Sequence, residues 1–215
     1  MNNNNSRNLT DKITKFDFEY PYKEGFAVVE LNQKWGFIDE NRELKCEIKY
    51  EHPYRYSPYK MDPLFFSEGL LPVGRPNEDG FVRFGYLNTE GEEACKFKFT
   101  AVTNFRNGLA IVRDENYKWL VINRKFEKIT KRTYDRIHDF FYGYAVVELD
   151  GLYGFINENG EEVCEIKYPY MSCFGPQGFA QIELPNKEAG RAYWIDTRGK
   201  EYYMEYNSDE MYALE

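Results

Sequence analysis

The sequence predicts an all-β protein of about five three-stranded antiparallel repeats, arranged as an open superhelical stack or in a propeller-like ring. Three observations support this fold class. Aromatic residues make up 18% of the 215 residues, and aromatic residues favour strands. Apolar and polar residues alternate with the period of two that is typical of a half-buried strand. The segment GFIDENRELKCEIKY at 36–50 returns as GFINENGEEVCEIKY at 154–168 with 11 identities, which indicates an internal repeat.

An aromatic residue, two variable positions and a glycine begin each repeat, as in YKEGFAVV at 22–29 and FRNGLAIV at 105–112. Successive glycines are 44, 39, 35 and 35 residues apart, so the basic period is about 35 residues. These glycines are Gly25, Gly69, Gly108, Gly143 and Gly178. The corresponding units cover residues of about 22–65, 66–104, 105–139, 140–173 and 174–206.

Each unit contains three segments with strand-like alternation. In the first unit these segments are FAVVEL at 26–31, KWGFID at 34–39 and CEIKY at 46–50. In CEIKY the apolar residues occupy one face of the strand, while Glu47 and Lys49 occupy the other. A single unit cannot bury its apolar face, so we expect neighbouring units to cover it. The expected core residues are Trp35, Phe37, Ile38, Phe84, Trp119, Phe155 and Trp194.

Two kinds of turn connect the predicted strands. Asn107 and Gly108 form a dipeptide that strongly favours a tight chain reversal. A second, polar turn ends in glycine in units two, four and five, at a position that needs a positive φ angle. Arg42 takes the place of this glycine in unit one. We therefore expect that turn to be strained by about 1 kcal/mol or to have a different shape.

The pattern Gly-x-Ala-x-Val, followed by KWGFID at 34–39, a polar turn and a tyrosine, resembles the WG-repeat family. Unit one has the full signature, unit four has Tyr153 in place of the tryptophan, and unit three keeps Trp119 but has Leu120 in place of the glycine. The resemblance covers about residues 16–206. It implies an array of small antiparallel β units, of a kind found mostly in bacterial proteins and supposed to mediate interactions. It implies no catalytic residues.

The sequence predicts one repeat domain at 16–206, between a flexible N-terminal tip at 1–15 and a C-terminal tail at 207–215. The tip is rich in asparagine, and polar residues with little to bury do not offset the entropy of ordering. The net charge of −8 opposes long-range attraction to nucleic acid or to an anionic membrane. The first residues lack the apolar core of a secretory signal, and no apolar stretch is long enough to span a membrane. We therefore expect a cytoplasmic protein without a membrane partner.

From the positions and spacing of the four cysteines and two histidines, we expect no catalytic site, no metal site and no cofactor. Cys46, Cys95 and Cys164 occupy the same position in units one, two and four, where units three and five carry Thr130 and Tyr203. A position that accepts cysteine, threonine and tyrosine is a packing position, and the usual spacing of zinc ligands does not occur. Two histidines also leave few candidates for a general base. We therefore expect a protein that is not an enzyme.

A basic segment at 124–136 is the first candidate binding surface. It carries six basic residues against Glu127 and Asp135 in a chain that is otherwise acidic. As a strand it would form a basic stripe for RNA, DNA or an acidic protein surface, although lysines that protect a strand edge explain the same pattern. The residues expected to contact an anionic partner are Arg124, Lys125, Lys128, Lys131 and Arg132.

The loop at 51–65 is the second candidate. Its three prolines and three tyrosines should make it stiff and rich in a residue type that dominates binding hot spots. Long loops on repeat scaffolds often form the binding face, although tyrosines that only cover the side of the array would explain the composition too. The residues expected to contact a protein partner are Tyr54, Tyr56, Tyr59, Met61 and Phe65.

These observations favour a non-enzymatic scaffold or adaptor that binds a protein partner. Exposed edge strands of an open array would also allow a homodimer. The alternative is an accessory or regulatory protein of a bacterial nucleic-acid machine, such as a phage-defence or CRISPR effector, that contacts RNA or the effector through the basic stripe. A further alternative, which rests on the abundance of tyrosine, is glycan binding on aromatic platforms.

Overall fold

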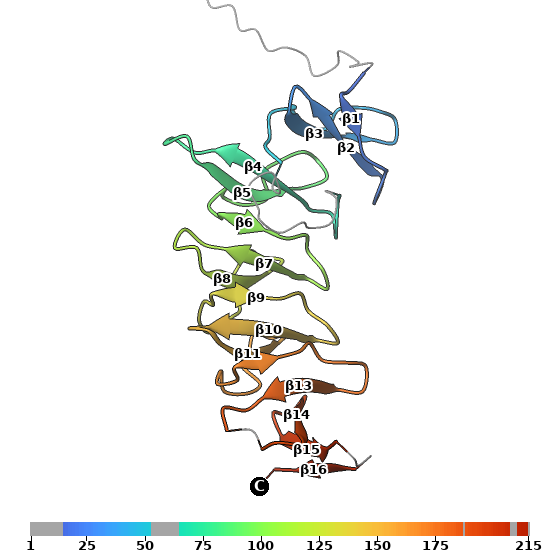
Figure 1. Cartoon of the computed structure of the whole chain (residues 1–215). Coiled ribbons are helices and arrows are strands. Elements are labelled where there is room, and N and C mark those ends of the chain that lie inside the picture. The colour runs from blue at the N-terminus through green and yellow to red at the C-terminus, as the bar shows by residue number, and fades with distance from the viewer. Residues whose placement is uncertain (1–14, 53–64, 187, 207–209, 215) are drawn as a thin grey trace, which may run out of the picture. The chain divides into compact units, whose positions relative to one another are not determined.

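A computed structural model gives the fold of the chain and confirms the all-β prediction. It describes residues 15–52, 65–186, 188–206 and 210–214. Within these residues, no helix is long and apolar enough to cross a membrane. The chain divides into two compact units, residues 1–115 and 116–215, and Figure 1 labels their strands in chain order.

Two hairpins and three further short strands build the first unit. The hairpins are β2–β3 and β4–β5, while β1 pairs with β2 and β6 pairs with β7, all antiparallel. The strands are β1 (Phe18–Glu19), β2 (Phe26–Leu31), β3 (Lys34–Asp39), β4 (Leu71–Pro76), β5 (Val82–Leu87), β6 (Ala101–Val102) and β7 (Leu109–Arg113).

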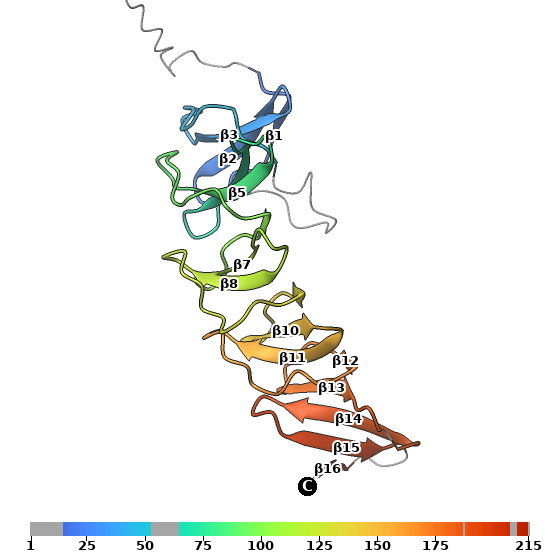
Figure 2. The same ribbon diagram turned by 90° about the vertical axis from the view of Figure 1, so that its left-hand side faces the viewer.

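The second unit contains β8, a three-stranded sheet in the order β11-β10-β9 and a five-stranded sheet in the order β12-β13-β14-β15-β16. Figure 2 shows the hairpin β10–β11 and the larger sheet that follows it. The strands are β8 (Trp119–Asn123), β9 (Arg136–Ile137), β10 (Tyr144–Leu149), β11 (Leu152–Asn157), β12 (Tyr170–Met171), β13 (Phe179–Glu183), β14 (Arg191–Asp196), β15 (Glu201–Glu205) and β16 (Met211–Ala213). Strand β16 lies in the segment predicted as a C-terminal tail.

The third strand of each small sheet comes from the end of the preceding repeat. Strand β6 lies at the end of the second repeat but pairs with β7 of the third. In the same way β9 pairs with β10, and β12 pairs with β13. In the second repeat a single bridge between Glu51 and Gly74 takes the place of this short strand. Backbone hydrogen bonds therefore join successive repeats.

The predicted reversal at Asn107 and Gly108 is a tight hairpin turn. Both residues have positive φ angles, 52° and 77°, as a two-residue turn between twisted strands requires. Arg106 and Leu109 exchange backbone N–H to C=O hydrogen bonds of 2.8 and 3.0 Å across it. The motif of an aromatic residue, two variable positions and glycine is therefore a hairpin signal.

Carboxylates link these turns in the first unit. The carboxylate of Glu24 accepts hydrogen bonds from the backbone N–H groups of Glu68 at 2.9 Å and Gly69 at 2.8 Å. The carboxylate of Glu68 in turn accepts a hydrogen bond from the N–H of Gly108 at 3.1 Å. A side chain at the same position of two repeats thus satisfies backbone donors of the next repeat.

A side-chain oxygen organises the polar turn after each long hairpin. Asn157 Oδ1 accepts hydrogen bonds from the backbone N–H groups two and four positions later, both at 3.0 Å, and Gly160 has a φ angle of 77°. Asp39 Oδ1 does the same in the first repeat, where Arg42 takes the glycine position with a φ angle of 62°. Arg42 therefore keeps the shape of the glycine turn, so the expectation of a different shape is wrong, and the strain of about 1 kcal/mol stays a prediction.

The prediction that CEIKY forms a strand is wrong for the first repeat. Residues 46–49 form no ladder, and isolated bridges flank them at Leu44 and Tyr50. The segment crosses over β3 at a glycine, because a Cβ atom on Gly36 would lie only 3.0 Å from Cγ1 of Ile48. The predicted alternation of burial therefore arises from a crossing segment and not from a paired strand.

The same correction holds in the fourth repeat and is reversed in the fifth. A Cβ atom on Gly154 would lie 2.9 Å from Cγ1 of Ile166, and the segment around Ile166 again forms no ladder. In the fifth repeat Tyr193 occupies the glycine position. There the returning segment lies alongside β14 as the regular strand β15, with Tyr193 opposite Tyr203.

The core lies between successive repeats within each unit, as predicted. One cluster combines Val28 and Phe37 with Leu71 and Val73 of the next repeat. A second cluster joins the fourth and fifth repeats in the same manner. In both, and also between the second and third repeats, an aromatic ring of the hairpin packs on the first aromatic ring of the next repeat. The ring centroids are 4.7 Å apart for Phe37 and Phe66, 5.0 Å for Tyr86 and Phe105, and 4.1 Å for Phe155 and Phe174.

Trp194 departs from the predicted core, while the six other expected residues are buried. Trp194 is only partly buried. The register explains this, because Trp194 pairs with Gln181 as Phe37 pairs with Val28. The Phe37 face is covered by the next repeat, whereas Gln181 is exposed to solvent. Trp194 is therefore the counterpart of Phe37 and not of the signature tryptophan.

Candidate functional site

The predicted loop surface lies mostly outside the described residues. This applies to Tyr54, Tyr56, Tyr59 and Met61. Phe65, which follows them, is partly buried, and the ammonium group of Lys23 lies 3.2 Å from the centroid of its ring. The described residues therefore fix the two ends of the loop at His52 and Phe65.

A row of aromatic side chains leads to the start of this loop. The ring centroids are 4.7 Å apart for Phe18 and Tyr20, 5.5 Å for Tyr20 and Trp35, and 4.6 Å for Trp35 and His52. We call Phe18, Tyr20, Trp35 and His52 the aromatic row. Its outer member, Phe18, is 50% exposed, and Trp35 is buried. The sequence predicts Trp35 as a core residue, whereas its continuation to the surface through Tyr20 and Phe18 is seen only in the structure.

The imidazole of His52 is uncharged at pH 7, as an apolar surface requires. Burial lowers the pKa of His52 from 6.5 to about 4, because desolvation penalises the charged imidazolium. The side chain is therefore neutral at pH 7. The aromatic row presents rings without a fixed positive charge where the loop begins.

The basic segment is exposed, but it is not the predicted strand. Isolated bridges at Lys128 and Tyr134 are its only ladder contacts between residues 124 and 134. The prediction of a strand that carries a basic stripe is therefore wrong, because the segment has the same pattern of isolated bridges as CEIKY. The five residues predicted to bind an anion are all exposed: Arg124, Lys125, Lys128, Lys131 and Arg132.

One of these five residues holds two repeats together. Arg132 Nε lies 2.7 Å from Oε1 of Glu162, and the hydroxyl of Tyr134 donates a 3.1 Å hydrogen bond to the same oxygen. Burial, and then the charge of Glu162, raise the pKa of Tyr134. Lys167 and Tyr168 contact Glu201 in the same way, at 2.9 and 2.7 Å. This arrangement recurs between neighbouring repeats, so Arg132 has a structural contact that the sequence did not reveal.

The equivalent cysteines have the character of packing residues. Burial raises the pKa of Cys46 and of Cys164 to about 11, so both are neutral thiols at pH 7. The pKa of Cys95 is raised for the same reason. Within the described residues, no group of three or more His, Cys, Asp or Glu side chains is placed to hold a metal ion.

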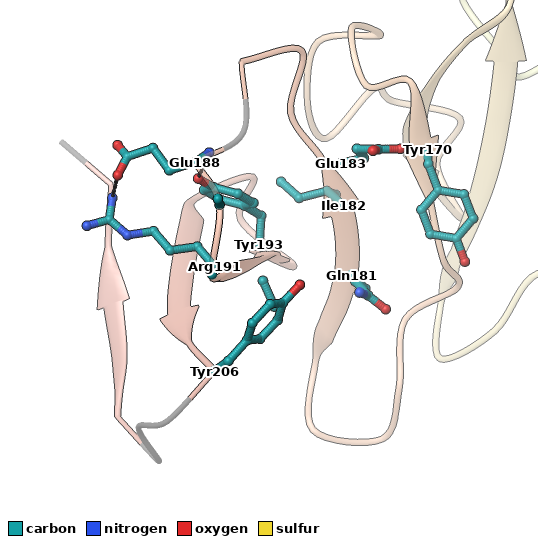
Figure 3. A pocket seen from close by; sticks show the side chains of 11 residues that line it. Tyr170, Gln181, Ile182, Glu183, Glu188, Arg191, Tyr193 and Tyr206 are labelled. Carbon is teal, nitrogen blue, oxygen red and sulfur yellow. Dashed lines mark hydrogen bonds and ion pairs between the residues drawn. The ribbon is translucent and has the colours of Figure 1, made fainter.

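A third surface is a cavity of about 470 Å³ at the loop end of the hairpin β13–β14. Figure 3 shows the side chains that line it, with Tyr206 projecting toward the strand that carries Gln181 and Ile182. Glu188 and Arg191 form an ion pair of 2.6 Å at its rim. This cavity was not predicted from the sequence. The available signal was the insertion at 185–192, which the fourth repeat lacks.

The chain matches one protein-family model. The model of the WG containing repeat matches residues 13–35, 84–119, 121–153 and 153–187, which together exceed half of the chain. No match is found among curated proteins.

Solved structures show a distant likeness. The chain is similar to a chain in the structure of S. cerevisiae Dbp5 bound to Nup159, Gle1, IP6 and ADP, and to the N-terminal domain of Nup159. For each of these the TM-score is 0.40, with 10% identity over 88% of this chain. BamB from Moraxella catarrhalis is similar with a TM-score of 0.33 and 11% identity over 89% of this chain. The chain spans 58% of the length of each of these solved chains.

The repeated hairpins, the glycine beneath the crossing segment in the first and fourth repeats, and the match of the family model agree with one another. The glycine after the signature tryptophan makes room for the crossing segment at Gly36, and the same contact recurs at Gly154. The chain belongs to the family of proteins built from the WG containing repeat.

Proposed function

We propose that this chain is a non-enzymatic scaffold that binds a protein partner through the aromatic row and the 53–65 loop. The observation that carries the proposal is the aromatic row, which connects the buried Trp35 to the exposed ring of Phe18 and reaches His52 at the start of the loop. Tyrosine and tryptophan dominate binding hot spots because they bury a large area at a small entropic cost. An aromatic row that ends at His52, where the tyrosine-rich segment of the sequence begins, supports protein binding.

The repeated residues support the non-enzymatic part of the proposal. The groups that would attract a catalytic interpretation serve packing or turns. Cys46 is a buried thiol and Cys164 a partly buried one, both with raised pKa values. Asp39 and Asn157 organise turns, and Glu162 joins two repeats. Because each recurs at equivalent positions, a shared structural role explains them.

A loop variant tests the scaffold proposal. The full chain is compared with a variant carrying Tyr54→Ser, Tyr56→Ser and Tyr59→Ser, first in affinity capture from the native host and then by titration with the purified captured protein. We expect the partner to bind the variant at least tenfold more weakly, because loss of one hot-spot side chain costs more than about 1 kcal/mol.

The matched control removes three exposed aromatic rings elsewhere, with Phe81→Ser, Tyr117→Ser and Tyr142→Ser. This control should bind the partner with the affinity of the unmodified chain. Equal binding by the loop variant and the unmodified chain would remove the loop from the proposal. An equal loss in both variants would show non-specific adhesion to aromatic surface.

The exposure of the basic segment supports a second candidate function, contact with RNA as an accessory of a nucleic-acid machine. Lys125, Lys128 and Lys131 are exposed, and exposed cations contribute the salt-dependent part of nucleic-acid binding. The test is a gel shift with a labelled single-stranded RNA and the variant Lys125→Glu, Lys128→Glu and Lys131→Glu, which leaves Arg132 in its structural ion pair. We expect the variant to lose the shift.

The charge-matched control for this test reverses three exposed lysines elsewhere, Lys96→Glu, Lys98→Glu and Lys200→Glu. It should keep the shift if the basic segment binds RNA. A shift lost equally in both variants would reflect net charge alone. No shift by the unmodified chain at low salt would reject this candidate.

A further inference from the structure

Strands β13 to β16 form one sheet (Figure 2), and its two faces have different surroundings. One face carries Ala180, Ile182 and Ile195, which belong to the core cluster shared with the fourth repeat. Successive side chains of a strand point to opposite faces, and the register aligns them across the sheet. We call the opposite face the terminal face, which carries Phe179, Gln181, Trp194, Tyr202, Met204 and Met211.

The terminal face is the counterpart of a face that packs on another repeat elsewhere in the chain. Gln181 lies opposite Trp194 in the register as Val28 lies opposite Phe37 in the first repeat. Phe37 is covered by Phe66 of the next repeat, with ring centroids 4.7 Å apart. Among the described residues no further repeat follows the fifth, so Gln181 is exposed and Trp194 is only partly buried. The terminal face thus continues the established series of contacts between repeats.

We propose that the terminal face binds the terminal face of a second copy of this chain and forms a two-fold symmetric homodimer. The inference does not rest on the proposed scaffold function. A second copy is the favoured occupant because, in the first and fourth repeats, the equivalent face packs on another repeat of the same chain. A two-fold contact brings the same surface from both chains together, so that surface must be complementary to itself.

The distribution of charge favours self-association through this face. Its middle is uncharged, and its carboxylates lie at opposite ends, Glu183 at the end of β13 and Asp196 at the end of β14. The carboxylate of Asp196 is paired with Arg198 at 2.8 Å. The chain has a net charge of −8, so association of two copies meets the least repulsion on an uncharged face. Homodimer interfaces are also more apolar than the remaining surface and are enriched in methionine and aromatic residues.

Gln181 suits a contact across a two-fold axis. Its amide group has both a donor and an acceptor, so two Gln181 side chains related by the axis can form hydrogen bonds with each other. The neighbouring ring of Trp194 supplies apolar area beside them.

Aromatic side chains of the terminal face are held in place within one chain. The rings of Phe179 and Tyr202 lie edge to face, with centroids 5.5 Å apart. The hydroxyl of Tyr202 donates a 3.1 Å hydrogen bond to the carboxylate of Asp196. Association therefore costs less side-chain entropy than it would for freely rotating rings.

The first repeat disfavours the alternative of head-to-tail association. A head-to-tail contact would need the face of the first repeat that corresponds to the Ala180 face of the fifth. That face is already covered by side chains of the first repeat and of the segment before it. Its fully buried residues are Ala27, Val29 and Ile38, and they pack against Phe16, Leu44 and Ile48. Contact between two terminal faces remains, and it closes at two chains.

Sedimentation equilibrium of the full chain over a dilution series tests the dimer. We expect a species with the mass of two chains of 25.6 kDa that dissociates on dilution. Gln181→Glu and Met211→Glu should each raise the dissociation constant at least about tenfold, because each places like charges from both chains in one interface. Gln181 is exposed and Met211 is 38% exposed, so neither change removes a core residue.

The matched controls make the same changes elsewhere, with Gln33→Glu and Leu152→Glu. Gln33 is exposed, and Leu152 is 38% exposed, as Met211 is. Both controls should keep the dissociation constant of the unmodified chain. Circular dichroism spectra report whether each variant is folded.

A cross-link tests the two-fold symmetry, because only a symmetric contact brings the same residue of two chains together. Cys173 is exposed and is first removed by Cys173→Ser. In this background Gln181→Cys should form a disulfide-linked dimer with oxidised glutathione, which requires the two Cα atoms to approach within about 7 Å. Gln33→Cys in the same background should not form one.

Four results would overturn the proposal. They are a single chain at every concentration, a mass that grows beyond two chains, a dimer that Gln181→Glu and Met211→Glu leave unchanged, and equal weakening by the test and control variants. Absence of the Gln181→Cys cross-link in a dimer would overturn its symmetry. Failure here leaves the loop test of the scaffold function unaffected, because that test changes only the 53–65 loop.

Discussion

At the scale of single residues, glycine in the polar turn serves two purposes. Gly91 and Gly160 have φ angles of 84° and 77°. A Cβ atom on Gly91 would lie 2.0 Å from the carbonyl oxygen of Lys45, and one on Gly160 would lie 2.6 Å from that of Ile129. The turn of one repeat thus abuts the backbone of the repeat before it. No described repeat precedes Arg42, and its guanidinium pairs with Glu19 through two hydrogen bonds of 3.0 Å.

A comparison of two glycines separates backbone strain from close approach. Gly160→Ala should lower the free energy of unfolding by about 2 kcal/mol or more, because a methyl group would collide with the backbone of Ile129. Gly143 has a φ angle of 85° but no atom within 4 Å of an added Cβ, so Gly143→Ala should cost only about 1 kcal/mol. Urea unfolding measures both. Equal losses would contradict the role of Gly160 in repeat contact.

At the scale of elements, the hairpins were predictable and the returning segment was not. Apolar alternation over β2 and β3 and the turn residues between them are local signals. The path of CEIKY depends on a contact ten or more residues away, where Gly36 lets Ile48 cross over β3. The alternation of its side chains is the same for a crossing segment and for a strand, so sequence periodicity does not distinguish the two.

The side-chain contacts of the basic segment also depend on the crossing path, which the sequence does not predict. Lys128 and Arg132 were grouped by sequence into one stripe, yet the crossing path gives them different roles. Arg132 pairs with Glu162 of the next repeat at 2.7 Å, whereas Lys128 is exposed at an isolated bridge to Ile122. Only the pairing of successive repeats brings Glu162 to Arg132, because the two are 30 residues apart in the chain.

At the scale of the whole molecule, each compact unit is stabilised by contacts between neighbouring repeats. The first aromatic ring of one repeat covers the hairpin of the repeat before it, as Phe66 covers Phe37 and Phe174 covers Phe155. Stability in such an array is close to a sum of contributions from each repeat and from each neighbouring interface. Strain or loss of contact in one repeat should therefore act first on its neighbours.

Phe66→Ala tests this description in the first unit. Phe66 is fully buried, so the substitution should lower the free energy of unfolding by about 3 to 5 kcal/mol. Hydrogen exchange should show the largest loss of protection in β2 to β5, which contact the ring, and a smaller loss in β10 to β14. The control Phe81→Ala removes a ring that is 62% exposed and should change stability by less than about 0.5 kcal/mol. A uniform loss of protection along the chain would contradict summed neighbour contacts.

The sequence by itself determined the repeat period, the hairpins, the tight turn at Asn107 and Gly108 and the family, because these depend on residues close together in the chain. The tertiary structure alone decided which segments cross a hairpin and which pair with it. It also decided that Trp194 lies beside the exposed Gln181 in the hairpin β13–β14, and that the N–H of Tyr206 donates a hydrogen bond to Gly190 in the insertion at 185–192. These features depend on how one repeat packs on the next, and long-range packing leaves no periodic trace in the residues that it brings together.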